Sequence, residues 1–231
     1  MLTYLFDLDE TILNLNWNLF EKDYYMKLAY AFSELLPIDK AAYYIQTSYR
    51  YMVDFVDNKR TNKDRFYDKM VELSGADKEK MIELEPHFYL EHYEDFKKYT
   101  YPNSNMVESV KTLNDKGFPL VIASNPVFPA IATLKRIAWA GLDASIFKRI
   151  TTFENEYACK PRIEYYENLL KELQLKAEDC IMVGNDIGED MMASLLNIKC
   201  ILITDDVIDS GEDYEYESMS SDEFLKYVKE L

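Results

Sequence analysis

Four short stretches of the chain hold side chains of the kind that phosphate chemistry uses. They are Asp7 to Thr11 (Asp-Leu-Asp-Glu-Thr), Ser124 with Asn125, Lys160 before Pro161, and Gly184 to Asp190, which contains Asn185, Asp186 and Asp190. A carboxylate can attack phosphorus and form an aspartyl-phosphate. A second carboxylate two residues on can protonate the leaving oxygen and then activate water. These residue types therefore indicate phosphoryl transfer to a carboxylate nucleophile.

The same residues indicate a divalent cation. Several carboxylates at close range raise one another's pKa values unless a cation lies between them. All the candidate ligands are oxygen donors, which suits Mg²⁺. Lys160 and a helix N-terminus expected at Pro161 would add positive charge, and Ser124 and Asn125 would add hydrogen-bond donors. We therefore expect Mg²⁺ as the cofactor.

Each stretch also has a simpler explanation as a turn, a helix cap or a solvated charge. An Asp-x-Asp-x-Thr string occurs by chance in roughly 5% of chains of this size, given ordinary residue frequencies. Taken singly, every stretch except the first is better explained in this way. Their combination, in this order and each after a suitable element, favours a reactive site.

The elements that would position these residues alternate along the chain. Leu2 to Phe6 is a short apolar run that predicts a buried strand ending at Asp7. After Asn103 apolar runs alternate with amphipathic segments, which predicts a parallel sheet covered by helices on both faces. Right-handed crossovers make such a fold a doubly wound α/β fold, with the ends of its strands at one edge. Further strands are expected at residues 120–123, 149–153, 180–183 and 200–204, and helices at residues 106–113, from 129, from 161, around 191–195 and at 222–231.

Residues 15–99 have a different character. Aromatic residues and leucines recur at helical spacing among charged residues, which predicts a bundle of helices. We therefore expect two units: residues 1–14 and 100–231 form the α/β domain, and residues 15–99 form a helical insertion. Because ligands bind beyond the carboxyl ends of parallel strands, an insertion after the first strand would cover the site as a lid.

The chain resembles the haloacid dehalogenase (HAD) superfamily over essentially its whole length. Phe6 to Thr11 matches the first motif of the family, Ser124 the second and Lys160 the third, and Asn185-Asp186 with Asp190 matches the fourth. Residues 15–99 match the helical (C1-type) cap. The resemblance implies a Rossmann-like core of the HAD type with this inserted cap.

The resemblance also implies a role for each residue. Asp7 would be the nucleophile and a metal ligand, Asp9 the general acid and base with its backbone carbonyl on the metal, and Asp186 a metal ligand. The phosphate-binding group would comprise Thr11, which would also orient the first loop, Ser124, Asn125 and Lys160. Many members have Asp where this chain has Asn185. Asn185 is therefore expected to support the metal site, and Asp190 to hold Lys160 or a metal-bound water.

The expected activity is Mg²⁺-dependent hydrolysis of a phosphate monoester, a small phosphorylated metabolite, through an aspartyl-phosphate. Dehalogenases of the superfamily typically lack the second acid, so Asp9 favours phosphoryl transfer. A phosphonatase would need a reactive cap lysine, and nothing marks Lys22 or Lys27 as one. A sugar-phosphate mutase shares all four motifs, and it stays an alternative together with a dehalogenase. A non-enzymatic binding protein is a further alternative, although such a relative should have lost some of these residues.

Composition limits the partners. The 231 residues carry a formal net charge of -16, which disfavours nucleic acid and anionic membrane surfaces. No signal peptide or bilayer-length apolar run is visible, and three widely spaced cysteines suit a reducing compartment. We expect a cytoplasmic monomer or homodimer. In the helical insertion, one of Arg50, Arg60 and Arg65 is hypothesised to contact the leaving group, while most tyrosines pack between helices with their hydroxyls reaching solvent.

Overall fold

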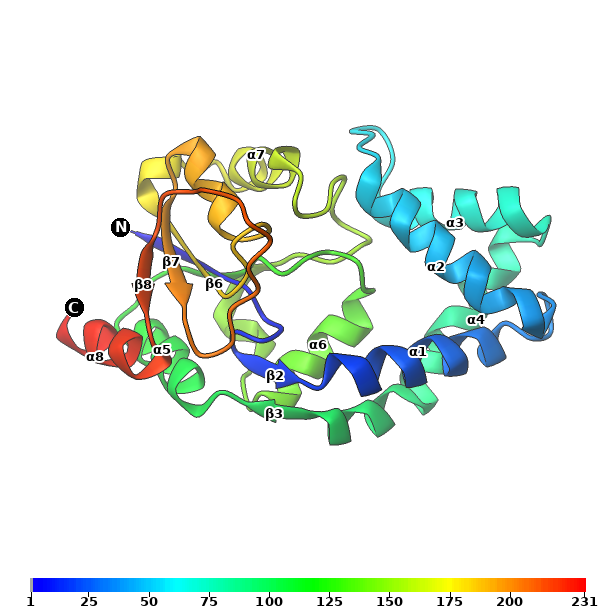
Figure 1. Cartoon of the computed structure of the whole chain (residues 1–231), viewed down its shortest axis with the longest axis horizontal. Helices are drawn as coiled ribbons and strands as arrows, with labels where there is room; N and C mark the ends of the chain where they lie inside the picture. The colour runs from blue at the N-terminus through cyan, green and yellow to red at the C-terminus, as the bar shows by residue number, and fades with distance from the viewer. Residues whose placement is uncertain (1) are drawn as a thin grey trace.

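The computed structural model describes residues 2–231 and has a six-stranded sheet at its centre (Figure 1). The strand order is β5-β4-β1-β6-β7-β8, and every neighbouring pair is parallel. The strands are β1 Thr3–Phe6, β4 Leu120–Ile122, β5 Phe147–Ile150, β6 Cys180–Gly184, β7 Lys199–Ile203 and β8 Glu217–Met219. After β1 the chain adds β4 and β5 on one side of it, and then adds β6, β7 and β8 on the other side. The predicted doubly wound α/β fold is confirmed.

Two apolar layers cover the sheet. Side chains alternate along a strand, so Tyr4 and Phe6 of β1 belong to one buried cluster and Leu5 to the other. The first layer holds α5 Ser104–Asp115, α6 Ala130–Trp139 and α8 Ser221–Glu230, and the second holds α7 Ile163–Leu173 and the 3-10 helix η4 Met191–Leu196. Strands buried on both faces need continuous apolar runs, which is why β1 and β6 were visible in the sequence.

From Trp17 to Tyr99 the chain forms a separate group of helices beside the sheet (Figure 1). These are α1 Trp17–Ala31, α2 Ile38–Asp54, α3 Asn62–Ser74, α4 Lys78–Glu91 and the 3-10 helix η1 Tyr93–Tyr99. The chain enters this group through β2 Leu13–Leu15 and leaves it through β3 Thr100–Pro102. These two strands pair antiparallel, with Leu15 opposite Thr100, so both connections run side by side.

The tyrosines of these helices differ from expectation in one respect. The Tyr24 hydroxyl lies 2.7 Å from the Tyr49 hydroxyl and 2.6 Å from the Tyr89 hydroxyl. All three side chains are buried, and a buried hydroxyl needs a hydrogen-bond partner. The prediction that the tyrosine hydroxyls reach solvent is therefore wrong for this trio.

Three predicted elements are also corrected. The helix expected to open at Pro161 begins at Ile163, because the Arg162 N–H donates to the Cys159 carbonyl and closes a turn first. The strand expected at residues 149–153 is Phe147–Ile150, and the helix expected around residues 191–195 is the 3-10 helix η4. Within residues 2–231 no helix is long and apolar enough to cross a membrane.

Candidate active site

The first loop leaves β1 at Asp7 and turns back on itself. The Asp7 N–H donates to the Val183 carbonyl of β6 at 2.9 Å, which continues the sheet pairing into the loop. Glu10 adopts φ 62°, a left-handed conformation uncommon for residues other than glycine, and its carboxylate accepts the Leu15 N–H at 2.8 Å. The turn places the Thr11 hydroxyl 3.3 Å from Asp7 Oδ2.

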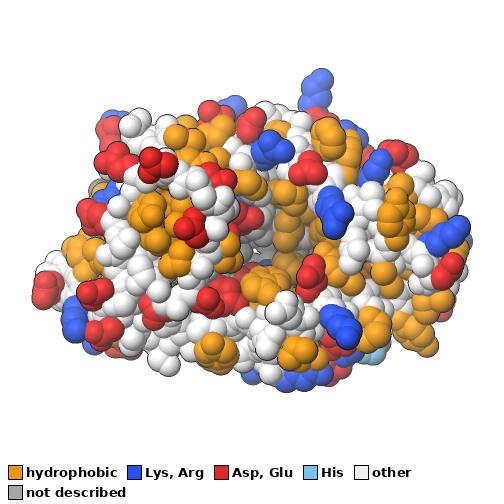
Figure 2. Space-filling model, viewed as in Figure 1, with side chains coloured by type: hydrophobic (Ala, Val, Ile, Leu, Met, Phe, Trp, Pro, Cys, Tyr) orange, Lys and Arg blue, Asp and Glu red, His pale blue; other side chains and the backbone are white. Residues whose placement is uncertain are grey.

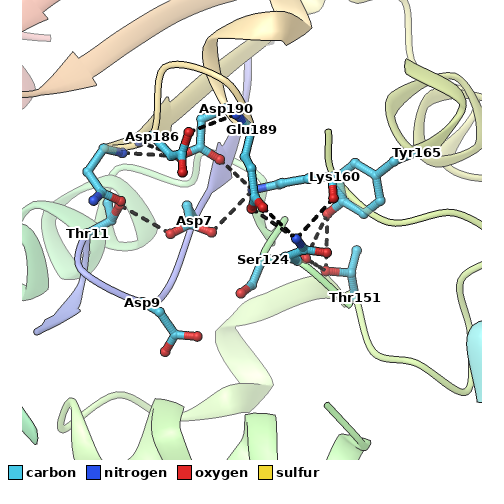
Figure 3. Close-up of polar contacts among 12 residues, drawn as sticks. Asp7, Asp9, Thr11, Ser124, Thr151, Lys160, Tyr165, Asp186, Glu189 and Asp190 are labelled. Carbon is cyan, nitrogen blue, oxygen red and sulfur yellow. Dashed lines mark hydrogen bonds and ion pairs between the residues drawn. The ribbon is translucent and has the colours of Figure 1, made fainter. Parts of the chain in front are cut away.

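Lys160 joins two acids at the carboxyl ends of the strands. Its ammonium lies 3.2 Å from Asp7 Oδ1 and 2.5 Å from Asp190 Oδ1, as Figure 3 shows. Burial would lower the pKa of Lys160, but Asp190, Tyr166 and Asp7 raise this pKa well above its ordinary value. The fully buried ammonium therefore stays charged beside Asp7.

Asp190 needs the glycine at the end of β6. Its Oδ2 accepts the N–H groups of Asn185 and Asp186, each at 3.1 Å. A Cβ on Gly184 would lie 2.1 Å from this same oxygen, far closer than two non-bonded heavy atoms can approach. Gly184 therefore lets the Asp190 carboxylate approach the backbone and hold the loop that carries Asp186.

Thr11 and Asn185 support this loop from the other side. The Thr11 hydroxyl lies 3.0 Å from Asn185 Oδ1, and Asn185 Nδ2 donates to the Asp206 carbonyl at 2.7 Å. Both residues are buried. In this arrangement the Thr11 hydroxyl is directed at Asp7 and Asn185, a position suited to orienting the first loop.

Ser124 and Asn125 follow β4 and lie beside Lys160. The Ser124 carbonyl accepts the Thr151 hydroxyl at 2.7 Å and the Tyr165 hydroxyl at 3.1 Å, which fixes the backbone of this turn. Asn125 Nδ2 donates to both Glu189 carboxylate oxygens, at 2.9 and 3.0 Å. Both Ser124 and Asn125 line the cavity above Asp7.

This cavity has a volume of about 230 Å³ and is strongly acidic. Its acidic lining comprises Asp7, Asp9, Glu10, Asp186, Glu189 and Asp190. Sequence analysis did not single out Glu10 or Glu189. Burial raises the pKa of Glu10 to about 8 and that of Glu189 to about 7. Glu10 and Glu189 could have been found in the sequence because they lie within two of the four stretches, directly beside Asp9 and Asp190.

Asp7 and Asp186 are the carboxylates that we expect to bind a cation. Burial raises the pKa of both carboxyl groups, so a cation between them would favour their ionised forms. In the part of the chain that the structure describes, no three His, Cys, Asp or Glu side chains group as a metal site. Mg²⁺, however, usually binds one or two carboxylates and completes its shell with water and substrate oxygens. The donor set therefore fits Mg²⁺.

Asp9 has a partner that sequence analysis missed. Arg136 of α6 is fully buried and forms an ion pair with Asp9 Oδ2, and its guanidinium lies over the Phe128 ring at 4.2 Å. Figure 3 shows the Asp9 carboxylate turned away from Asp7. The available signal was helical spacing, because Arg136 lies four residues after the buried Ala132 on the same face of α6.

The three arginines proposed for the leaving group lie in different places. Arg65 is buried and donates to the Met52 carbonyl at 2.9 Å and the Tyr157 carbonyl at 3.0 Å, so the hypothesis is wrong for Arg65. Arg60 forms ion pairs with Asp57 at 2.6 Å and Asp68 at 3.0 Å. Arg50 lines a second cavity beside the first.

Comparison with known proteins agrees with the fold and identifies a family. The sequence profile of the haloacid dehalogenase-like hydrolases matches residues 1–194, and the chain belongs to this family. A glyceraldehyde 3-phosphate phosphatase from Methanothermobacter thermautotrophicus is 24% identical over 212 residues, which cover 90% of this chain and 88% of that protein.

Two solved structures share the fold. A HAD phosphatase from Thermococcus onnurineus has a TM-score of 0.59 at 19% identity and covers 99% of this chain and 98% of its own. The putative HAD-hydrolase YfnB from Bacillus subtilis, described as bound to magnesium, has a TM-score of 0.58 at 21% identity and covers 100% of this chain and 99% of its own.

Proposed function

We propose that the chain is a Mg²⁺-dependent hydrolase of phosphate monoesters that uses Asp7 as the nucleophile. The observation that carries the proposal is the contact between the buried, charged Lys160 and Asp7, which lines an acidic cavity at the carboxyl ends of β1, β4 and β6. An ammonium at this place can hold both the nucleophile and a phosphoryl oxygen. Family membership and the phosphatase named among the relatives support a small phosphorylated substrate.

The reaction proceeds in two displacements. Asp7 Oδ2 attacks phosphorus, the bond to the leaving oxygen breaks, and Asp9 gives its proton to that oxygen. The ionised Asp9 then takes a proton from water, which attacks the phosphoryl group and releases phosphate and the Asp7 carboxylate. Ser124, Asn125 and Lys160 hold the phosphoryl oxygens during both steps.

Asp9 has to turn for this chemistry. Its carboxylate is bound to Arg136 and directed away from Asp7 (Figure 3), which leaves its Oδ1 without a hydrogen-bond partner in the described chain. Rotation about its side-chain bonds would bring the carboxyl group to the leaving oxygen. Arg136 therefore holds Asp9 in a conformation from which it has to rotate before it can act. Asp9 and Phe128 both line the cavity, and Arg136 contacts the Phe128 ring.

The Asp7 and Asp186 carboxylates and the Asp9 carbonyl would hold Mg²⁺. When bound, the ion neutralises charge that develops on the transferring phosphoryl group. Asp190 and Asn185 keep the Asp186 loop in place through the backbone and side-chain hydrogen bonds described above.

The helical insertion would act as a cap. In this proposal residues 15–99 cover the site, residues 1–14 and 100–231 form the catalytic domain, and the paired β2 and β3 connect the two. Trp17 of α1 already lines the cavity that contains Asp7, so a small shift of the helices would change access to the site.

Hydrolysis of p-nitrophenyl phosphate tests this function. The wild type should release p-nitrophenol in Mg²⁺, lose this activity in excess EDTA and regain it when Mg²⁺ is restored. The Asp7→Asn variant should lose at least a thousandfold in kcat while keeping the circular dichroism spectrum of the wild type, because an amide cannot attack phosphorus. Turnover by Asp7→Asn at the wild-type rate would rule out the proposed nucleophile.

A further inference from the structure

A second cavity of about 420 Å³ lies beside the catalytic one, between α1 and α2. We call it the aromatic chamber and define it by the six aromatic residues in its lining: Trp17, Phe20, Tyr24, Tyr25, Tyr49 and Phe128. Space-filling Figure 2 shows a hollow near the centre of this face, with hydrophobic side chains at its walls. The chamber is thus larger than the catalytic cavity, and its walls are mostly apolar.

The chamber and the catalytic cavity share a wall. Trp17, Val127 and Phe128 line both, so the two cavities adjoin and a leaving group that extends past these side chains from a phosphate over Asp7 would enter the chamber. Trp17 is 37% exposed, a large fraction for an indole, and its ring is available to a bound molecule. The chamber is therefore placed to receive the leaving group.

The chemistry of the lining selects against a polar leaving group. The hydroxyls of Tyr24 and Tyr49 are hydrogen-bonded to each other at 2.7 Å, so these residues offer ring surface rather than free hydroxyls. A small polyol in this space would leave that ring surface in contact with water, whereas a flat ring would cover it and stack on it.

The charges at the chamber select against a second phosphate. Its charged lining residues are Glu21, Arg50 and Asp54, two acids and one base. The base alone does not give the net positive charge that a second phosphate would need. A neutral ring satisfies both the apolar walls and this charge balance.

We propose that the aromatic chamber binds the leaving group of the substrate and that this group is an alcohol carrying a flat aromatic or heteroaromatic ring. The proposal rests on the phosphatase function above and names its substrate class. It differs from the name of the relative quoted above, because glyceraldehyde 3-phosphate has no ring.

A matched pair of non-hydrolysable phosphonates tests the chamber without turnover. Calorimetry in Mg²⁺ would compare 3-phenylpropylphosphonate with propylphosphonate, which differ only in the ring. The wild type should bind the phenyl compound at least tenfold more tightly, because burial of one ring on an apolar wall is worth about a factor of ten or more. Trp17→Phe should keep this preference.

Two variants separate the chamber from general effects. Trp17→Ala should reduce the preference to less than threefold. Leu19→Ala is the control, since Leu19 lies on the same helix, is 51% exposed, and is absent from both linings as residues 2–231 define them. Leu19→Ala should bind both compounds as the wild type does.

The two proposals fail in different ways. Equal affinities of the wild type for both phosphonates, or binding of neither, would overturn the chamber as an aromatic subsite, and so would a preference that survives Trp17→Ala. The hydrolysis of p-nitrophenyl phosphate, which carries an aromatic ring of its own, is a separate measurement from these binding results. The absence of p-nitrophenyl phosphate hydrolysis in a folded, Mg²⁺-loaded wild type would instead overturn the phosphatase function.

Discussion

Asp190 has both carboxylate oxygens occupied by the protein. One accepts the Lys160 ammonium at 2.5 Å, and the other accepts the N–H groups of Asn185 and Asp186. Both Asp190 and Lys160 are buried, so neither charge has water as an alternative partner. Asp190 thus has a structural role that can be measured separately from catalysis.

Asp190→Asn should destabilise the protein strongly. The substitution leaves Lys160 buried with Asp7 as its remaining acidic partner, and breaking a buried pair costs about 3–5 kcal/mol. Urea unfolding at neutral pH measures the change. Asp222→Asn is the control, because the Asp222–Lys226 pair is exposed and should leave the unfolding free energy unchanged. Equal stability of the two variants would contradict the structural role of Asp190.

At the scale of elements, the end of β6 depends on a residue without a side chain. Gly184 is the last residue of β6, and the Asp190 carboxylate occupies the space where its Cβ would be. Nothing in an apolar run followed by Gly-Asn-Asp shows that the carboxylate six residues after the glycine returns to this point. The sequence marks the loop, and the structure gives the reason for the glycine.

Gly184→Ala should therefore reduce both stability and activity. The added methyl group displaces Asp190, and such overpacking in a rigid site costs about 1–3 kcal/mol. Gly188→Ala is a matched control on the same loop, because its Cβ would meet the hydroxyl of the exposed Ser210, which can move away. Urea unfolding and p-nitrophenyl phosphate turnover would be measured for both variants. Equal losses of stability and activity in Gly184→Ala and Gly188→Ala would show that Asp190 tolerates the methyl group.

The helical group contains a buried acid whose titration is open to measurement. Burial raises the pKa of Glu85 in α4 to about 7 from an ordinary value of 4.5. Between these values the folded protein binds more protons at this site than the unfolded chain does. The unfolding free energy should therefore fall as pH rises from 4.5 to about 7.

Glu85→Gln should remove this part of the pH dependence. An amide does not titrate. The unfolding free energy of the variant should therefore rise relative to that of the wild type by roughly 3 kcal/mol across that interval, at 1.36 kcal/mol per pKa unit. Urea unfolding at a series of pH values gives the difference between the two proteins and cancels the titration of the other buried acids. Parallel curves for wild type and variant would show that Glu85 titrates normally.

At the scale of the whole molecule, the sequence predicted what depends on long patterns and missed what depends on local contacts. Continuous apolar runs predicted β1 and β6, and helical spacing predicted the group of helices between β2 and β3. β2, β3 and β8 were missed because, unlike the equally short β4, none of them is a continuous run of buried apolar residues. The start of α7 was placed early because a turn before it depends on one backbone hydrogen bond.

The candidate residues follow the same rule. Asp7, Lys160 and Asp190 could be placed at one sheet edge because each follows a predicted strand or opens a predicted helix, and the structure brings them into contact. Arg136 could not be found in this way. Helical spacing places Arg136 on the buried face of α6, but it does not identify the partner of the guanidinium, and only the structure shows the contact with Asp9.

The covalent intermediate on Asp7 is the central claim, and rapid-quench labelling tests it most directly. The measurement would use phosphate-labelled p-nitrophenyl phosphate with the wild type, Asp9→Asn and Asp7→Asn. The account predicts that Asp9→Asn accumulates label on the peptide containing Asp7, because this leaving group needs no acid while water still needs a base. Asp7→Asn should carry none. Turnover by the wild type with no label on the Asp7 peptide, in either the wild type or Asp9→Asn, would contradict the account.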